Sequence, residues 1–152
     1  MKTIHVKSAR MFFSAMALIG LGVGLGWTAK TVRAAPESPH FVYEVRTYTT
    51  EPGRLPALHA RFRDHTVKLF EKHGMKNVVY LTPVDAEGKA VDNKLVYLLA
   101  HKSQAAAKAS FDTFRQDPDW KAARDASEKD GKILSIPPES QFYVPTDYSP
   151  MK

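Results

Sequence analysis

Two similar segments, each a strand followed by a helix, constrain the fold more than any other feature of the chain. The first begins at Phe41 (FVYEVRTYTTEPGRLPALHARFRDHTVKLFEKHG), and the second ends at Trp120 (NKLVYLLAHKSQAAAKASFDTFRQDPDW). In the first segment, residues 41–49 alternate between two sets of side chains with the period of a strand. Leu55, Leu58 and Phe62 then follow helical spacing. The repetition predicts a split βαβ fold.

Local signals predict the remaining elements. The first helix ends at His73-Gly74, where glycine supplies a left-handed stop. The predicted strands are residues 41–49, 77–82, 95–101 and 140–144, the third of them almost wholly apolar and therefore central. Ser103 caps the second helix, and Asp117-Pro118 begins a short third helix that ends near Gly131. The order β-α-β-β-α-β predicts an α+β, ferredoxin-like fold with a four-stranded antiparallel sheet and helices on one face.

A sheet of this kind leaves its second face without helices. We expect that face to carry a mixture of polar and apolar side chains, namely Glu44, Arg46, Tyr48, Tyr80, Tyr97 and His101 with Leu95 and Leu99. So large a mixed surface is too apolar to remain in water. We therefore expect two copies to pack sheet to sheet as a homodimer, a dimeric α/β barrel that encloses a cavity.

The first 34 residues have the features of a signal peptide. Basic residues at the start precede an uncharged stretch, Met11 to Ala29, and Val32 and Ala34 are small residues suited to cleavage before Ala35. Residues 35–40 then form a Pro-rich linker before the domain at residues 41–148. The chain is expected to be exported, periplasmic or secreted. The alternative is an uncleaved anchor with the domain facing outside, because the stretch approaches the roughly 20 residues that span a bilayer.

The net charge of +6 does not indicate nucleic-acid binding. Five of the 22 basic residues lie in the first 34 positions, where there is no acidic residue, so the remainder holds 17 basic and 16 acidic residues. Such a balance provides no electrostatic footprint for phosphate backbones. The chain has no cysteine, which excludes disulfides and zinc sites that use sulfur.

Four strings in the chain resemble a known family. They are Tyr43-Glu44-Val45-Arg46-Thr47-Tyr48, Phe70-Glu71-Lys72-His73-Gly74-Met75, Leu95-Val96-Tyr97-Leu98-Leu99-Ala100-His101 and Phe114-Arg115-Gln116-Asp117-Pro118-Asp119-Trp120. In this order and spacing they resemble the NIPSNAP family. The resemblance implies a dimeric α/β barrel and does not imply a reaction. Proteins of the wider barrel superfamily include cofactor-independent monooxygenases, haem-handling enzymes and small-molecule lyases, which is an analogy of fold.

The expected lining of the barrel provides the candidate site. Ligand-binding candidates are Glu44, Arg46, Tyr48, Tyr80, Tyr97 and His101, and candidates for a catalytic role are His65, His101 and Arg46. His65 follows Phe62 by three residues and precedes Leu69 by four, which places it on the apolar stripe of the first helix, facing a pocket between helix and sheet. Each histidine has a second interpretation as a hydrogen-bonded structural residue. Glu44 and Arg46 have one as an ion pair that sets dimer register.

No spacing of histidines and carboxylates indicates a metal site, and no cofactor is expected. The favoured function is an exported domain that binds a small molecule or a protein partner. The alternative is a cofactor-independent, monooxygenase-like enzyme, and a third possibility is a membrane-tethered interaction module. The enzyme requires a closed cavity on which at least two of Arg46, Tyr80, Tyr97, His65 and His101 converge.

Overall fold

The structure, a computed structural model, describes residues 41–151. The predicted signal peptide (1–34) and linker (35–40) lie outside the described residues. Within residues 41–151, no helix is both long enough and apolar enough to cross a membrane.

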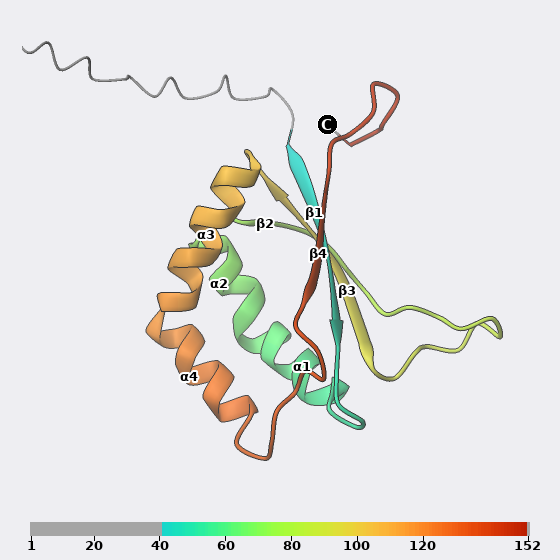
Figure 1. Ribbon diagram of the computed structural model, residues 1–152, viewed down its shortest axis with the longest axis vertical. Coiled ribbons are helices and arrows are strands. Elements are labelled where there is room, and N and C mark those ends of the chain that lie inside the picture. The colour runs from blue at the N-terminus through green and yellow to red at the C-terminus, as the bar shows by residue number, and fades with distance from the viewer. Residues whose placement is uncertain (1–40, 152) are drawn as a thin grey trace, which may run out of the picture. The chain divides into compact units, whose positions relative to one another are not determined.

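One antiparallel sheet and one layer of helices make up the domain (Figure 1). The strands are β1 (Val42–Thr49), β2 (Lys76–Leu81), β3 (Lys94–His101) and β4 (Glu139–Tyr143), in the order β2-β3-β1-β4. The helices are α1 (Leu55–Arg61), the π-helical segment η1 (Phe62–Thr66), α2 (Val67–Lys72), α3 (Gln104–Gln116) and α4 (Pro118–Ser127). This confirms the predicted α+β, ferredoxin-like fold, and β3 is a central strand as predicted.

Side chains at the helix starts have the predicted capping roles. The Ser103 hydroxyl accepts a hydrogen bond of 3.0 Å from the backbone N–H of Ala106. The Asp117 carboxylate accepts one of 2.8 Å from the backbone N–H of Asp119, with Pro118 at the first helical position of α4. Each bond satisfies a backbone donor that a helix start leaves without a partner.

The first helical region is interrupted by the wider π-turn of η1, where the backbone N–H of Val67 donates to the carbonyl of Phe62, five residues earlier. A wider turn rotates the chain less per residue. Thr66 therefore reaches the core, where it is 1% exposed, and His65 lies on the exposed side. The prediction that His65 lies on the apolar stripe and faces the sheet is wrong for this reason.

The core between the two layers is rich in aromatic rings. Phe62 packs edge to face on Tyr97 with centroids 5.2 Å apart, and Phe70 lies 5.0 Å from Phe114. Trp120 packs against Phe114 at 4.5 Å and thereby anchors α4 on this cluster. Rings at these separations contribute about 1 kcal/mol each beyond the area that they bury.

The face of the sheet beneath the helices is the one that carries the candidate residues. Arg46 lies opposite Tyr97 in the β1–β3 register, and Tyr97 contacts Phe62 and Phe70 of the helical layer. The guanidinium of Arg46 stands 4.5 Å from the ring of Phe111 in α3. The prediction that this mixed face is uncovered is therefore wrong. Its charges pair with one another, so helices can cover it without leaving a charge unpartnered.

The opposite face of the sheet carries no helix among the described residues (Figure 1). By the same register it carries Tyr43, Val45, Thr47, Val79, Leu81, Val96, Leu98, Ala100 and Tyr143, with the polar Glu139 and Gln141 on β4; Tyr43 and Ala100 are buried. We call these residues the open face. Leu81 is 51% exposed and Tyr143 is 52% exposed. An uncovered face exists, as predicted, but it is more apolar than the predicted one.

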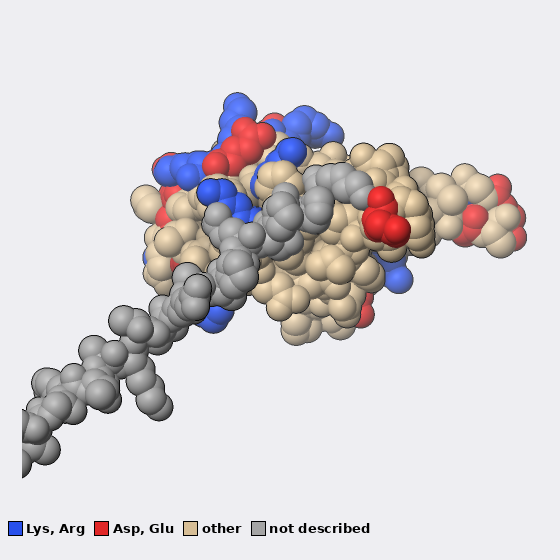
Figure 2. Space-filling view, turned by 90° about the horizontal axis from the view of Figure 1, so that it is seen from above, with Lys and Arg blue, Asp and Glu red and all other residues tan. Residues whose placement is uncertain are grey.

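Acidic and basic side chains are intermixed on the surface seen in Figure 2 rather than separated into fields of one sign. That view agrees with the balance of 17 basic and 16 acidic residues beyond residue 34. The absence of a nucleic-acid partner stays a prediction.

Asp117 joins the end of α2 to the start of α4. One carboxylate oxygen caps α4, and the other lies 2.9 Å from Lys72 Nζ and 2.6 Å from His73 Nε2. The hydrogen bond from Lys72, followed by that from His73, holds the pKa of Asp117 well below its usual value and outweighs the opposing effect of burial. The junction is therefore stronger when Asp117 is ionised.

The Asp117→Asn variant should have a weaker dependence of stability on pH. A carboxyl whose folded pKa is lowered contributes stability above its unfolded pKa, near 3.8, and loses it as the pH falls toward the folded value. We expect the free energy of unfolding of the wild type to fall progressively below about pH 5. The variant should have a lower free energy of unfolding at neutral pH, and that value should fall less on acidification. Chemical denaturation from pH 7 downward measures this. The exposed Asp125→Asn variant is the control, and parallel curves for wild type and Asp117→Asn would contradict the prediction.

Candidate ligand-binding site

A group of polar side chains, three of them buried, lies on the helix-covered face of the sheet. Arg46 donates from Nη1 to Glu44 Oε1 at 2.6 Å and from Nε to the Tyr97 hydroxyl at 3.0 Å. Glu44 also accepts from the Ser140 hydroxyl at 2.5 Å and from His101 Nε2 at 3.0 Å. We call Glu44, Arg46, Tyr97, His101 and Ser140 the polar cluster. Strands β1, β3 and β4 all contribute to it.

Ionised forms of Glu44 and Arg46 are stabilised by each other. Burial acts to raise the pKa of Glu44, but the hydrogen bonds from His101, Ser140 and Arg46 outweigh it and hold this pKa below the usual value. Burial likewise acts to lower the pKa of Arg46, and the interactions with Tyr97, Tyr48 and Glu44 outweigh it, so this pKa is raised. Glu44 is 2% exposed, so its charge depends on these partners.

Tyr97 is wholly buried, and burial raises its pKa well above the usual value. The hydroxyl therefore stays protonated and accepts the hydrogen bond from Arg46. Together Glu44 and Tyr97 hold two of the three guanidinium nitrogens of Arg46. The third, Nη2, makes no hydrogen bond or ion pair within residues 41–151. The guanidinium is thus fixed in orientation and keeps a nitrogen with two N–H donors unused.

A cleft between α3 and the sheet reaches this guanidinium. It has a volume of about 470 Å³. Its walls come from β1 and β4 on one side and from α3 on the other: Glu44, Arg46, Phe142, Gln104, Ala105, Ala107, Lys108, Phe111 and Arg115. We call it the α3 cleft. The small side chains of Ala105 and Ala107 leave room between the helix and the sheet at this place.

The structure brings the six predicted ligand-binding residues into one neighbourhood. The Tyr48 ring lies 5.3 Å from the Tyr97 ring, and Tyr80 stacks on Tyr97 at 5.5 Å. The Tyr80 hydroxyl donates to the side-chain oxygen of Asn77, and burial is the main cause that raises the Tyr80 pKa. Glu44 and Arg46 line the α3 cleft, whereas the three tyrosines support the sheet side of the core.

His101 is 2% exposed and lies beneath the cleft rather than at a pocket mouth. Its ring stands 6.3 Å from both Phe111 and Phe142, which line the cleft. Because Nε2 donates to Glu44, Nδ1 of the neutral ring is an acceptor, and it is buried without a hydrogen-bond partner among the described residues. An unpaired buried acceptor costs free energy.

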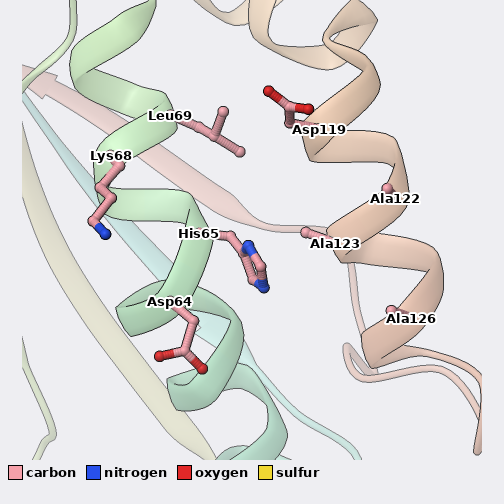
Figure 3. Close-up of a pocket in the computed structure, with 8 residues that line it drawn as sticks. All are labelled: Asp64, His65, Lys68, Leu69, Asp119, Ala122, Ala123 and Ala126. Atoms are coloured by element: carbon pink, nitrogen blue, oxygen red, sulfur yellow. The ribbon is translucent and has the colours of Figure 1, made fainter.

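His65 lies apart from this site, in a groove between η1–α2 and α4 (Figure 3). In that view its ring points into the space between the helices, toward the alanines of α4. The groove has a volume of about 510 Å³ and is lined by Asp64, His65, Lys68, Leu69, Asp119, Ala122, Ala123 and Ala126. His65 therefore lies apart from Arg46 and His101, the other two candidates for a catalytic role.

Within residues 41–151, no three His, Asp or Glu side chains are grouped so that they could hold a metal ion.

Sequence comparison shows the family. The sequence pattern described as NIPSNAP matches residues 43–150, which is most of the chain. The chain belongs to the NIPSNAP family. A comparison with curated proteins finds no match.

Solved structures of NIPSNAP proteins share this fold. A NIPSNAP family protein of unknown function from Agrobacterium tumefaciens has 22% identity and a TM-score of 0.61, over 74% of this chain and 95% of that one. An uncharacterized NIPSNAP domain protein from Burkholderia xenovorans has 21% identity and a TM-score of 0.58, over 72% of this chain and 98% of that one. At such identities the likeness shows the fold alone.

Two residues of the site in this NIPSNAP domain, Ser140 of the polar cluster and Phe142 of the cleft, could not be found from the alternation of β1 and β3 alone. Ser140 joins the polar cluster because the β1–β4 register places it opposite Arg46. Phe142 lies opposite Glu44 in the same register. The signal that could have found them is the parity of β4, since alternate residues of one strand share a face. The pairing of β4 with β1 is also needed to show on which face of the sheet these residues lie.

The Glu44→Gln variant should be strongly destabilised. It removes the carboxylate that partners Arg46 and leaves a buried charge uncompensated, which costs about 3 kcal/mol. Replacing both members, in Glu44→Leu/Arg46→Met, should recover most of that loss, because no charge then stays buried. Urea denaturation measures the free energy of unfolding. The exposed Glu139→Gln variant on β4 is the control, and a loss below about 1 kcal/mol for Glu44→Gln would contradict the prediction.

Proposed function

We propose that this NIPSNAP domain binds a small organic molecule in the α3 cleft. The observation that carries the proposal is a cleft with a fixed, partly exposed charge at its base. The side chain of Arg46 is 15% exposed although its partner Glu44 is buried. Ligand sites combine mostly apolar walls with a few placed polar groups and have volumes of roughly 300–1,000 Å³. The α3 cleft, at about 470 Å³, has this combination.

A purely structural ion pair accounts for fewer of these features. Two well-packed apolar residues would stabilise the domain as well as a buried ion pair, or better. Arg46 lines the α3 cleft, and its Nη2 has no acceptor within residues 41–151. Binding of a ligand is supported by that spare donor.

A cofactor-independent, oxygenase-like enzyme remains the second candidate. The observation that favours it is the buried, unpartnered Nδ1 of His101, whose ring is oriented by Glu44 as the base of a catalytic pair would be. Of the five residues expected to converge on a closed cavity, however, Arg46 alone lines the α3 cleft. Tyr80 and Tyr97 are hydrogen-bonded to other groups, and His65 lies in the other groove. Binding is therefore placed first.

We also propose that the domain works as a homodimer through the open face. The centre of this face is Leu98, which lies opposite Val45 on β1 and Val79 on β2. Soluble monomers rarely expose contiguous apolar surface of more than a few hundred Å². A second copy presents the same surface, as a two-fold interface requires.

Export is a further proposal, supported by the signal-peptide features of residues 1–34. It places the domain in the periplasm or outside the cell. The membrane-anchored alternative keeps the same domain outside and differs in the retained first segment.

Binding in the α3 cleft predicts a localised response to ligands. In an NMR screen of small organic molecules, we expect shift changes in backbone amides of α3 and β4. The Ala105→Trp variant, which fills the cleft, should abolish them. Ala109→Trp, one turn later on α3 and outside the lining, should not. Responses that persist in Ala105→Trp, or that cluster elsewhere, would disprove the proposal. Oxygen uptake with a bound ligand and no added cofactor would favour the enzyme.

The homodimer predicts a mass of two chains in native mass spectrometry of protein purified from its own cells. With export and cleavage, each chain should begin at residue 35. The Leu98→Asp variant should be monomeric, because a carboxylate at the centre of the open face is not tolerated in an apolar interface. Ala122→Asp on the helical layer is the control and should stay dimeric. A folded wild-type monomer would rule out the dimer, and an intact first segment would rule out cleavage.

A further inference from the structure

We infer that the ligand of the α3 cleft carries a carboxylate, which binds Nη2 of Arg46, on an aromatic or aliphatic body that packs against Phe111 and Phe142. This inference rests on the proposed function, because it names the class of molecule that the same cleft takes.

The donor geometry of Arg46 is the first argument. Nη1 is held by Glu44 at 2.6 Å and Nε by Tyr97 at 3.0 Å, so the plane of the guanidinium is fixed before any ligand arrives. Nη2 offers N–H donors and has no acceptor within the described residues. The N–H donors of Nη2 match a carboxylate in charge, and such charge-assisted hydrogen bonds are about twice as strong as neutral ones. Preorganisation lowers the entropy cost of binding.

The charge of the lining is the second argument. The α3 cleft is lined by three basic side chains, Arg46, Lys108 and Arg115, and by one acidic side chain, Glu44. Lys108 and Arg115 both pair with Asp112, at 2.7 and 2.5 Å, so the rim keeps one positive charge in excess. Glu44 is already engaged by Arg46, His101 and Ser140. The balance favours an anion over a cation.

The aromatic walls are the third argument. Phe111 lies under the guanidinium at 4.5 Å, and the half-buried Phe142 forms part of the opposite, β4 side of the cleft. Apolar lining binds the carbon body of a ligand by removing it from water. Inorganic anions cannot use these walls. An organic carboxylate uses both the walls and Nη2.

Three probes of one shape test the class: 2-naphthoate, 2-naphthamide and 2-naphthylmethylamine. At constant ionic strength, titration followed by NMR should give shift changes in α3 and β4 amides, with 2-naphthoate binding at least about tenfold more tightly than the amide, a difference of about 1.4 kcal/mol. The amine should bind more weakly still. Inorganic phosphate at equal concentration should not displace 2-naphthoate.

Variants separate the contribution of Nη2 from that of the fold. Arg46→Lys keeps a cation beside Glu44 and removes Nη2, so it should lose about tenfold in affinity for 2-naphthoate and leave 2-naphthamide unchanged. Lys129→Gln, at an exposed lysine outside the cleft lining, is the matched control and should change affinity less than threefold. Circular dichroism confirms that each variant is folded. Glu44→Leu/Arg46→Met is a second variant without Nη2, for use if Arg46→Lys fails to fold.

The outcomes distinguish this inference from the proposed function. Equal binding of the three probes in the cleft would overturn the carboxylate class and leave small-molecule binding intact. Displacement by phosphate would overturn it in favour of a general anion site. Binding of 2-naphthoate that survives Ala105→Trp would place it outside the cleft and overturn the inference. Absence of cleft binding by these probes and by the wider screen would overturn both.

Discussion

The ion pair between Glu44 and Arg46 is the interaction on which the arrangement of the domain depends. Two charges on one face of β1 can be covered by helices only when both oxygens of the carboxylate find hydrogen-bond donors. Glu44 meets this requirement through Ser140 and His101, which bring β4 and β3 into the same cluster. The same contacts orient the guanidinium of Arg46. One set of hydrogen bonds therefore joins three strands of the sheet and fixes the charged group that lines the α3 cleft.

Much of the fold could be predicted because its signals are local. Strand alternation, the Ser103 cap and the Asp117-Pro118 helix start depend on residues within a few positions of one another. The face that the helices cover could not be assigned in this way, because β1 carries large side chains on both faces. Alternation sorts the residues into two faces but does not tell which of the two the helices cover. His65 was misplaced because the π-turn of η1 shifts the helix by part of a turn, and residues 62–66 carry no signal of it.

The candidate site was predicted in composition more than in shape. Glu44, Arg46, Tyr97 and His101 do meet, as their shared parity on β1 and β3 predicted. The opening to solvent is made by α3 and β4, which lie about 60 and 100 residues from β1 along the chain. Such contacts follow from strand order and helix packing, which emerge when the whole domain is assembled.

Strand β1 takes part in two surfaces at once. Its residues alternate between the polar cluster and the open face, so Arg46 has as immediate neighbours Val45 and Thr47, which point the opposite way. A single strand thickness therefore separates the base of the cleft from the surface available to a second chain. If the proposed ligand site and the proposed dimer are both correct, substitutions at Glu44 or Arg46 would alter ligand binding, and those at odd-numbered positions of β1 would alter association. Such a division lets the two properties diverge among relatives while the backbone stays the same.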